Sequence, residues 1–453
     1  MSRAWVLLSF LVASASSAEA QDAQRKTQDA DLALPATRQV LNNGLVVIAA
    51  PDLRADGVWV HMIFRAGALY EPPGRSGLAH LAEHLLATGS SSDTDYARAA
   101  EARGSWYFNA TTSAETMSFE LGLPAVELPF GLWMMADRVG RGAEGFEPEV
   151  FRREREVVEV ERALVHLDRP YARPDLAIQR RVFGPDHPLT GGVIGHPEHL
   201  ESAELEDVRD FVESRIRASN AVLIVLGRFE PEGLPALLET TVARLPRREV
   251  PPAAPREPSA WQPKGALALD ERWSRQPRVS LVWKMPRPNR VTLDILELSA
   301  VLLGGFVDGA FGSRVHAGVL RAGADVIFRL DVVLPYDKPV RAAQGEAEVF
   351  LRYLTAVDMP THYYDAVRQR IDLELMFALD SLPQRGRLLW AAERQGQPPE
   401  ALPAVLTRHW RWHRHDVQHT AWKTLIQSVP RLTFHARPTR PRQPKLSWED
   451  RNP

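Results

Sequence analysis

Six prolines lie between residues 246 and 263, and this segment constrains the fold more than any other feature of the sequence. They are Pro246, Pro251, Pro252, Pro255, Pro258 and Pro263. Because proline has no backbone N–H and a fixed φ, neither a packed helix nor a central strand carries prolines at this density. Residues 246–265 are therefore predicted to be an interdomain linker. Helix and strand patterns repeat loosely on its two sides, which predicts two similar domains at 37–245 and 266–436.

The composition is that of an ordinary globular protein. With 453 residues, and a prior of roughly 150 residues per domain, the chain is long enough for two sizeable cores. The 55 basic and 57 acidic side chains nearly cancel, so charge gives no reason to expect nucleic acid or an anionic membrane surface as the main partner. Because the chain contains no cysteine, disulfides, thiolate metal ligands and cysteine nucleophiles are excluded.

The amino terminus has the layout of a secretory signal peptide. Arg3 precedes an apolar run from Ala4 to Val12, and Ala18 and Ala20 frame a cleavage site. Residues 1–20 are therefore predicted to be a signal peptide, with an uncleaved anchor as the alternative. The run is too short to form a stable membrane span, and no later segment is apolar enough for one. An exported, periplasmic protein is the simplest interpretation, with a flexible lead-in at 21–36 and a disordered tail at 437–453.

Both predicted domains mix strands and helices. In the first, Asn43-Gly44 between two apolar runs predicts a β-hairpin, because both residues tolerate positive φ. Apolar periodicity predicts further strands at 58–64, 116–123 and 221–226, and helices at 77–87, 148–165 and 204–215. The second domain has strand patterns at 278–283 and 325–334, and helix patterns at 291–303, 340–357 and 363–379. The predicted fold class is α+β, with two similar domains that each pack helices on a mostly antiparallel sheet.

The helix predicted at 77–87, which Ser76 can cap, carries a metal-binding pattern. His80 and His84 are four residues apart, so their side chains project from one face and can converge on one ion. Neutral imidazole suits Zn²⁺, and a catalytic zinc site needs three protein ligands and one open position. Glu83 lies beside the same face, where it could accept the proton of a catalytic water. The order His-x-x-Glu-His is the inverzincin signature.

A third ligand is predicted on the helix 148–165. Its segment Glu154-Arg-Glu156-Val-Val-Glu159-Val-Glu161 offers four carboxylates. Glu154 and Glu161 are nearly two turns apart and share one face, while Glu156 and Glu159 point elsewhere, and Val157 and Val158 mark the adjacent buried side. We assign Glu161 as the third ligand, and Glu154 as a carboxylate that orients a ligand histidine or the water.

Three blocks of this sequence resemble the pitrilysin/insulinase family of inverzincin zinc metallopeptidases, whose members include the mitochondrial processing peptidase. The first, Gly77-Leu-Ala-His80-Leu-Ala-Glu83-His84-Leu-Leu-Ala-Thr-Gly89, is similar to the family's metal helix. The second, from Glu154 to Glu161, is similar to the helix whose last glutamate is the family's third zinc ligand. The third, Gly104-Ser-Trp-Tyr-Phe-Asn109-Ala110-Thr111, resembles the family's edge strand that pairs with substrate backbone. The resemblance covers about residues 37–435.

This resemblance implies a function and a partner. The chain would be a zinc endopeptidase with one Zn²⁺ ion, cleaving peptides or unfolded polypeptides inside a chamber of which it forms one half of a clam shell. The other half would be a second copy or a similar chain without the metal motif. Asn109 and Ala110 would contact substrate, and Arg314 stands where the family has an arginine that holds the substrate carbonyl. The family's tyrosine is missing near Asp325, and the next tyrosine is Tyr336.

A second class of function stays open. Members of such families can persist as structural or binding subunits after losing catalysis. The missing tyrosine favours dependence on a partner chain, whereas the complete His80, Glu83 and His84 motif favours an enzyme. His187 and His196 lack ligand spacing and are interpreted as loop residues.

Overall fold

The computed structural model describes residues 35–88, 95–252, 266–305, 313–335, 338–355, 359–429 and 431–438. The predicted signal peptide, most of the lead-in and most of the predicted linker lie outside these ranges, as do Gly89 and Tyr336. Strand β11 includes Arg437 and Pro438, the first two residues of the predicted tail, and the rest of the tail lies outside the described ranges.

Six strands form the first sheet, in the order β1-β2-β6-β3-β5-β4. Their bounds are β1 Thr37–Val40, β2 Val46–Pro51, β3 Gly57–Phe64, β4 Tyr107–Thr112, β5 Met117–Pro124 and β6 Ala221–Gly227. Only β2 and β6 pair in parallel, and the other neighbours are antiparallel. The predicted hairpin is confirmed, because β1 pairs with β2 and Gly44 adopts a positive φ of 88° in the turn.

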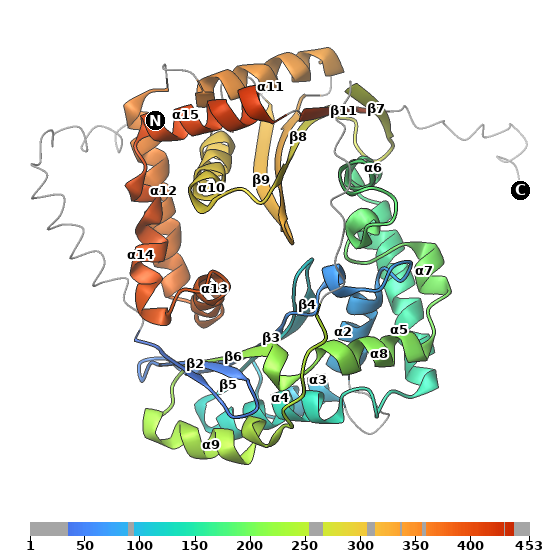
Figure 1. The fold of residues 1–453 in the computed structure, drawn as a ribbon, viewed down its shortest axis with the longest axis vertical. Helices are drawn as coiled ribbons and strands as arrows, with labels where there is room; N and C mark the ends of the chain where they lie inside the picture. Colours follow the sequence, from blue (N-terminus) through green and yellow to red (C-terminus); the bar gives the residue numbers. More distant parts are fainter. Residues whose placement is uncertain are drawn as a thin grey trace, which may run out of the picture.

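Helices cover one face of this sheet (Figure 1). The helices of the first half are α2 Leu78–Thr88, α3 Tyr96–Glu101, α4 Leu128–Arg141, α5 Pro148–Glu161, α6 Ala172–Phe183, α7 Pro197–Glu201, α8 Leu205–Arg215 and α9 Leu234–Thr240. Of these, α6 packs instead against the second sheet, described next. Alternate residues of β3, such as Val58 and Val60, share one core with Leu81 and Leu85 of α2. Apolar side chains recur every second residue in β3 and every fourth residue in α2, so each element has one apolar face, and these two faces pack together.

The second sheet repeats the topology of the first. Its order is β7-β11-β8-β10-β9, with bounds β7 Ala266–Glu271, β8 Arg278–Pro286, β9 Arg314–Ala322, β10 Asp325–Val333 and β11 Arg431–Pro438. Here too one neighbouring pair, β7 and β11, is parallel and the others are antiparallel. Without β1, the first sheet has the same sequence of parallel and antiparallel neighbours. The predicted α+β class with two similar units is confirmed.

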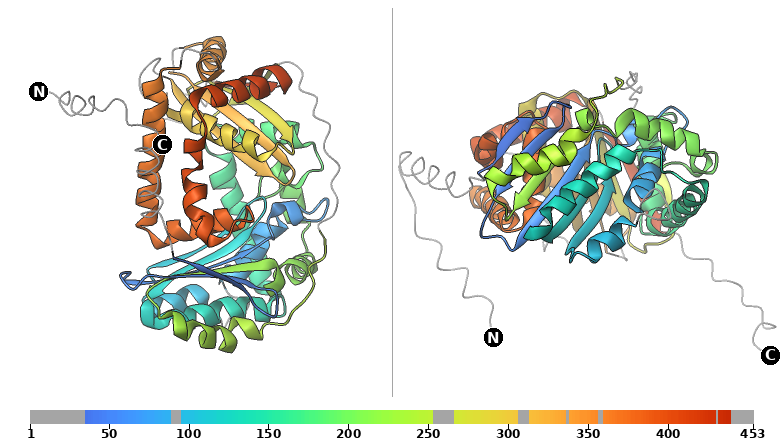
Figure 2. Two further views of the ribbon diagram at one scale, coloured as in Figure 1. Left: turned by 60° about the vertical axis from the view of Figure 1, so that its left-hand side comes forward. Right: turned by 90° about the horizontal axis from the view of Figure 1, so that it is seen from below.

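The helices of the second half do not all pack on the second sheet. They are α10 Arg290–Gly305, α11 Val340–Thr355, α12 Thr361–Leu379, α13 Leu382–Glu393, α14 Leu402–Leu406 and α15 Arg414–Ala421. Figures 1 and 2 show α12 running down from the second sheet to the first, where α13 lies across the sheet. There Leu389 and Leu402 form a core with Trp59 and Ile63 of β3. The first sheet is thus covered on both faces.

Polar contacts also fix α13 on the first sheet. Three ion pairs join them: Arg385 to Asp52 (2.7 Å), Arg387 to Glu120 (3.2 Å) and Arg38 to Glu393 (2.8 Å). Gly386 lies so close to the buried Trp59 that a Cβ atom there would be 1.8 Å from the indole ring. No described helix is long and apolar enough to cross a bilayer.

Candidate metal centre

The first turn of α2 is held by a buried carboxylate. Glu71, which is 2% exposed, accepts hydrogen bonds through Oε1 from the backbone N–H groups of Gly77 (3.0 Å) and Ala79 (2.9 Å). A negative charge at a helix N-terminus satisfies free N–H groups and interacts favourably with the helix dipole. The expectation that Ser76 caps this helix is wrong, because its hydroxyl instead bonds His199 Nδ1 (2.8 Å) and accepts from the N–H of His196 (3.0 Å).

The structure brings the three predicted metal ligands together. His80 Nε2 lies 3.8 Å and His84 Nε2 lies 3.4 Å from Glu161 Oε2, and one ligand atom from each residue lies within 4.8 Å of the others. Zinc bonds of about 2.0–2.1 Å at tetrahedral angles place ligand atoms about 3.3 Å apart. Two imidazoles and one carboxylate at this spacing fit a zinc ion and leave a fourth position open.

Glu161 is the last residue of α5. The helix begins with Pro148 in its first turn, where a missing N–H costs nothing, and Val158 anchors it in the core at 0% exposure. After Glu161 the chain continues as a wider π-helical turn, Arg162–Leu167, so the predicted helix to residue 165 changes type at the ligand. Val157 was predicted to be buried and is 44% exposed, because only Val158 points into the core.

Glu154 lies beside His84, one of the candidate ligands, where the sequence interpretation places it. Its Oε2 is 3.3 Å from His84 Nδ1, the ring nitrogen opposite the one near Glu161, and Arg153 donates to its Oε1 (3.1 Å). Burial alone would lower the pKa of His84, but the hydrogen bond to Glu154 and the charges of Glu83, Glu154 and Glu161 together outweigh burial and raise it. Burial would likewise raise the pKa of Glu154, and the contacts with His84 and Arg153 lower it. This contact fixes the ring orientation of His84.

Glu83 is buried next to the candidate ligands, and it is held by a partner that the sequence did not predict. It is 7% exposed, and burial raises its pKa above the ordinary value of a glutamate. Thr112, the last residue of β4, donates its hydroxyl to Glu83 Oε2 (2.6 Å), which opposes that rise. Thr112 stands one residue beyond the Asn-Ala-Thr block, and nothing in its spacing to His80 or His84 signals this contact.

The strand that carries Asn109 and Ala110 is an edge strand. In the described sheet, β4 pairs only with β5, so one side of its backbone is available to an extended peptide. Ala110 packs against the core on the α2 side. Asn109 alternates to the other face, opposite Glu120 in the register.

Arg314 is placed in a different part of the molecule. It begins β9, the edge strand of the second sheet, is exposed, and donates to Gln276 Oε1 (2.5 Å). The residues of the described chain that it contacts do not include His80, His84 or Glu161. Phe311 and Gly312 of the block that suggested Arg314 lie outside the described ranges.

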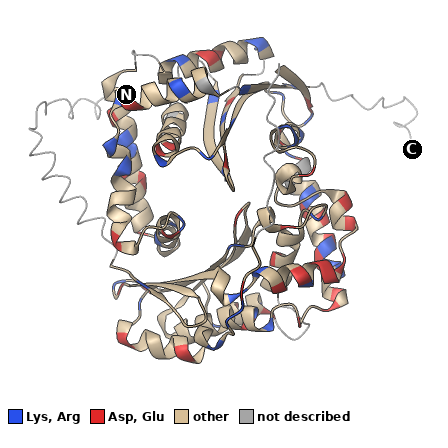
Figure 3. Ribbon diagram, in the orientation of Figure 1, with Lys and Arg blue, Asp and Glu red and all other residues tan. Residues whose placement is uncertain are grey.

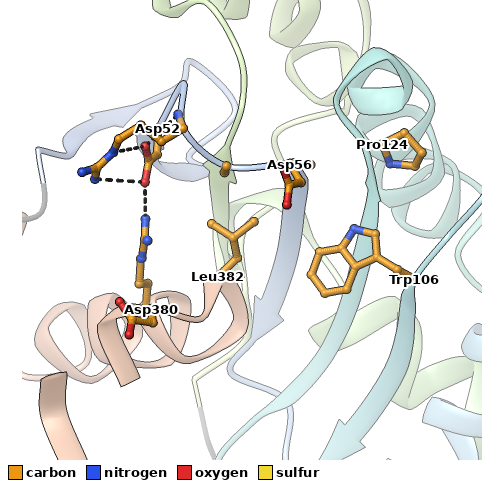
Figure 4. Close-up of a pocket in the computed structure, with 10 residues that line it drawn as sticks. Asp52, Asp56, Trp106, Pro124, Asp380 and Leu382 are labelled. Atoms are coloured by element: carbon orange, nitrogen blue, oxygen red, sulfur yellow. Dashed lines mark hydrogen bonds and ion pairs between the residues drawn. The ribbon is translucent and has the colours of Figure 1, made fainter. Parts of the chain in front are cut away.

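A cavity of about 670 Å³ lies at the other end of β4, next to Trp106 (Figure 4). Asp52 on its wall accepts hydrogen bonds from Arg54 and Arg385, which hold the pKa of its carboxyl well below the usual range. Leu382 and Arg385 contribute the first turn of α13 to the same wall. The cavity lies at the junction of α13 with the first sheet. It is separate from the candidate metal centre, because Glu83 contacts Thr112 at the opposite end of β4.

Basic and acidic side chains are mixed around the candidate centre. Figure 3 shows both signs interspersed on the helices around α5 and α8. Local pairs such as Arg152 with Glu149 and Arg209 with Glu206 account for part of this mixture.

Two models of one peptidase family match this chain. The family model described as insulinase (peptidase family M16) matches residues 46–176, and the model of the peptidase M16 inactive domain matches residues 202–324. The chain belongs to the insulinase family. The resemblance seen in the three sequence blocks is thereby confirmed.

Relatives in this family carry zinc protease names. A protein named uncharacterized zinc protease from Mycobacterium tuberculosis is 30% identical over 271 residues, 58% of this chain and 60% of that protein. Zinc protease PqqE of Helicobacter pylori is 26% identical over 193 residues, 41% of this chain and 42% of that protein. The match therefore spans less than two thirds of these relatives.

Solved structures share the fold of this insulinase-family chain. A protease from Helicobacter pylori superposes with a TM-score of 0.80 at 18% identity, over 90% of this chain and 100% of that one. The periplasmic protease PqqL from Escherichia coli superposes with a TM-score of 0.70 at 17% identity, over 89% of this chain but 47% of that one. This fold thus occurs both as a whole chain and as half of a longer one.

Proposed function

We propose that the protein is a zinc-dependent endopeptidase that hydrolyses peptides or unfolded polypeptides. The observation that carries the proposal is the convergence of His80, His84 and Glu161 within 4.8 Å, with the buried Glu83 on the same helix as the two histidines. Zinc protease names among the relatives support the same chemistry.

Each residue of the centre has a role in this proposal. His80, His84 and Glu161 would hold one Zn²⁺ per chain, and Glu154 would orient His84. When bound, zinc supplies a Lewis acid that polarises the substrate carbonyl and acidifies water. Glu83 accepts the proton of the attacking water and then delivers it to the leaving amine.

The substrate would bind as an extended strand. The open side of β4 offers backbone N–H and C=O groups, with Asn109 and Ala110 at its middle, and pairing there would bring the peptide alongside Glu83 at the Thr112 end. Arg314 would serve a site on a partner chain, since its own contacts lie within the second half.

The proposal extends to assembly and location. Because this fold forms one half of the longer PqqL chain, we propose that the protein pairs with a second copy or with a similar chain lacking the metal motif. The signal-type amino terminus supports a periplasmic location. Within the chain, 37–245 would be the metal-binding domain, joined by 246–265 to a second domain at 266–436.

A peptide-cleavage assay on the purified protein, with and without a chelator, tests the enzyme. Cleavage should disappear with the chelator and return with zinc. Glu83→Gln should keep zinc and lose hydrolysis by about 100-fold or more, because general-base catalysis contributes about 10²–10⁴-fold. His80→Ala should lose zinc itself, whereas Glu156→Gln, exposed on α5, is the matched control that keeps both. Chelator-insensitive cleavage, or full activity of Glu83→Gln, would refute the mechanism.

One observation favours a second candidate, a subunit that depends on a partner for catalysis. In the part of the chain that the structure describes, Arg314 contacts none of the candidate ligands, and it lies within residues 202–324, which match a model described as the peptidase M16 inactive domain. Size-exclusion chromatography combined with the same assay separates the two. A dependent subunit would bind zinc and peptide yet cleave only after a similar partner chain is added.

A further inference from the structure

Thr112 makes a contact that the metal motif does not contain. Its Oγ1 donates a hydrogen bond of 2.6 Å to Glu83 Oε2, and the two residues belong to different elements, β4 and α2. Strand alternation explains the placement, because Phe108 and Ala110 also turn toward the core shared with α2. The contact is short, as hydrogen bonds to a carboxylate are.

The hydrogen bond restricts the orientation of a flexible side chain. A glutamate has three rotatable bonds, and rotation of its carboxylate moves the oxygen that would accept a proton. At 7% exposure, Glu83 has little water to hold it in place. With Oε2 engaged by Thr112, Oε1 is the oxygen left for the attacking water.

We propose that Thr112 is a positioning residue that aligns Glu83 for catalysis and ties that alignment to the substrate-pairing strand. The inference rests on the proposed function, since it assigns Thr112 a role in the same reaction. Thr112 ends the strand whose open side would pair with substrate, so a peptide that orders β4 also orders the hydroxyl that holds the base.

The neighbouring residue provides a matched control. Thr111 also lies on β4, but its side chain alternates to the other face, where its hydroxyl pairs with Ser118 Oγ (2.9 Å). Replacing either threonine by valine removes one hydroxyl at nearly constant shape. Only Thr112→Val removes a contact with Glu83.

The experiment compares Thr112→Val, Thr112→Ser and Thr111→Val with the wild type, using kcat, KM and zinc content. Thr112→Val should lower kcat by about 10- to 100-fold, the cost of a misplaced catalytic group, with KM and zinc content unchanged. Thr112→Ser should restore kcat to within a few-fold of the wild type, and Thr111→Val, which keeps the contact with Glu83, should retain a higher kcat than Thr112→Val. Equal kcat in the two valine variants, or loss of zinc from Thr112→Val, would overturn the inference.

A double mutant shows whether Thr112 acts through Glu83. In the Glu83→Gln background, Thr112→Val should cause no further loss of the residual rate, and the same fold loss in both backgrounds would overturn the inference. A crystal structure of zinc-free Thr112→Val should show the Glu83 carboxylate rotated from its wild-type position, and an unmoved carboxylate counts against it. A wild type that stays inactive both alone and with a similar partner chain would refute the proposed function and the inference together, whereas an active wild type with an equally active Thr112→Val refutes the inference alone.

Discussion

The two halves of the molecule share a strand order but differ in the helix that follows their first central strand. In the first half this helix is α2, which carries His80, Glu83 and His84 and packs beside the edge strand β4. In the second half it is α10, which packs beside the edge strand β9 and contains no histidine. The scaffold is therefore common to both, and the candidate chemistry depends on a few polar residues placed on one copy.

The difference extends to buried polarity. The buried face of α10 is apolar apart from Ser299, whose hydroxyl is satisfied within the helix by the carbonyl of Ile295 (2.7 Å). The first half instead buries Glu83 and Glu154 at 7% and 4% exposure, each with a partner. Buried charges cost stability unless they are paired. The second half also buries charged side chains, such as Glu271 and Lys284, but none of those lies on α10, whereas Glu83 lies on α2 itself.

The largest predicted effect is loss of the proposed metal site, which distinguishes the first half from the second. Glu161→Gln replaces a charged ligand by a neutral amide of the same size. Replacing a residue that only orients a ligand lowers metal affinity by up to about 100-fold. Replacing the ligand itself should lower zinc affinity by more than that, and cleavage should fall with it. Calorimetric zinc titration measures this, with Glu159→Gln on the same helix as the control. Stoichiometric, tight zinc binding by Glu161→Gln would mean that the metal-binding half is not defined by this residue.

A smaller effect is expected one contact further from the metal. Glu154→Gln should weaken zinc binding by about 10- to 100-fold, because the amide no longer supplies the negative charge beside His84 Nδ1. The protein should remain folded, since Arg153, the other partner of Glu154, is exposed. Unchanged zinc affinity would show that Glu154 contributes to packing and does not orient His84.

Local patterns were sufficient for the elements that carry the candidate site. Both helices and the hairpin could be predicted because their periods, turn residues and spacing are properties of short segments. The pairing of His80 with His84 follows from helix geometry alone. Spacing along the helix 148–165 led to Glu161 as the third ligand and the family resemblance supported it, but spacing alone does not show that this helix folds back beside α2.

The sequence patterns did not predict the contacts between elements that are distant in the chain. Glu71 caps α2 instead of the nearer Ser76, because Ser76 is drawn into bonds with His196 and His199. The docking of α13 on the first sheet was also missed, since nothing in the pattern of α13 identifies the sheet it covers. Thr112 was missed for the same reason, because its contact with Glu83 depends on how β4 lies against α2.

A third prediction concerns the charges that join the two halves. Asp175 of α6 lies 2.6 Å from both Arg278 of β8 and Arg329 of β10. Asp175→Asn should lower the free energy of unfolding by about 2–3 kcal/mol near pH 7, because both arginines lose a partly buried counter-charge. Urea unfolding measures the change, and Asp186→Asn, exposed in the loop after α6, is the control.

The same contact predicts how stability depends on pH. Burial alone would raise the pKa of Asp175, but Arg329 and Arg278 outweigh it and lower the pKa. A lowered folded pKa contributes stability above the unfolded value of about 3.9, and this contribution is lost as the pH falls toward the folded value. The gap between wild type and Asp175→Asn should therefore shrink in acid. A gap that stays constant from pH 7 to pH 3 would exclude this electrostatic origin.

The smallest predicted effect tests the contact by which the second half covers the first sheet. Gly386→Ala places a methyl group against the ring of Trp59, which is 0% exposed and cannot move into solvent. α13 must then shift outward, which should cost about 1–2 kcal/mol of unfolding free energy, as overpacking typically does. Gly345→Ala in α11 is a matched control, since nothing lies within 4 Å of its added Cβ and alanine favours a helix. If both substitutions stabilise the protein equally, α13 is not held tightly against the first sheet.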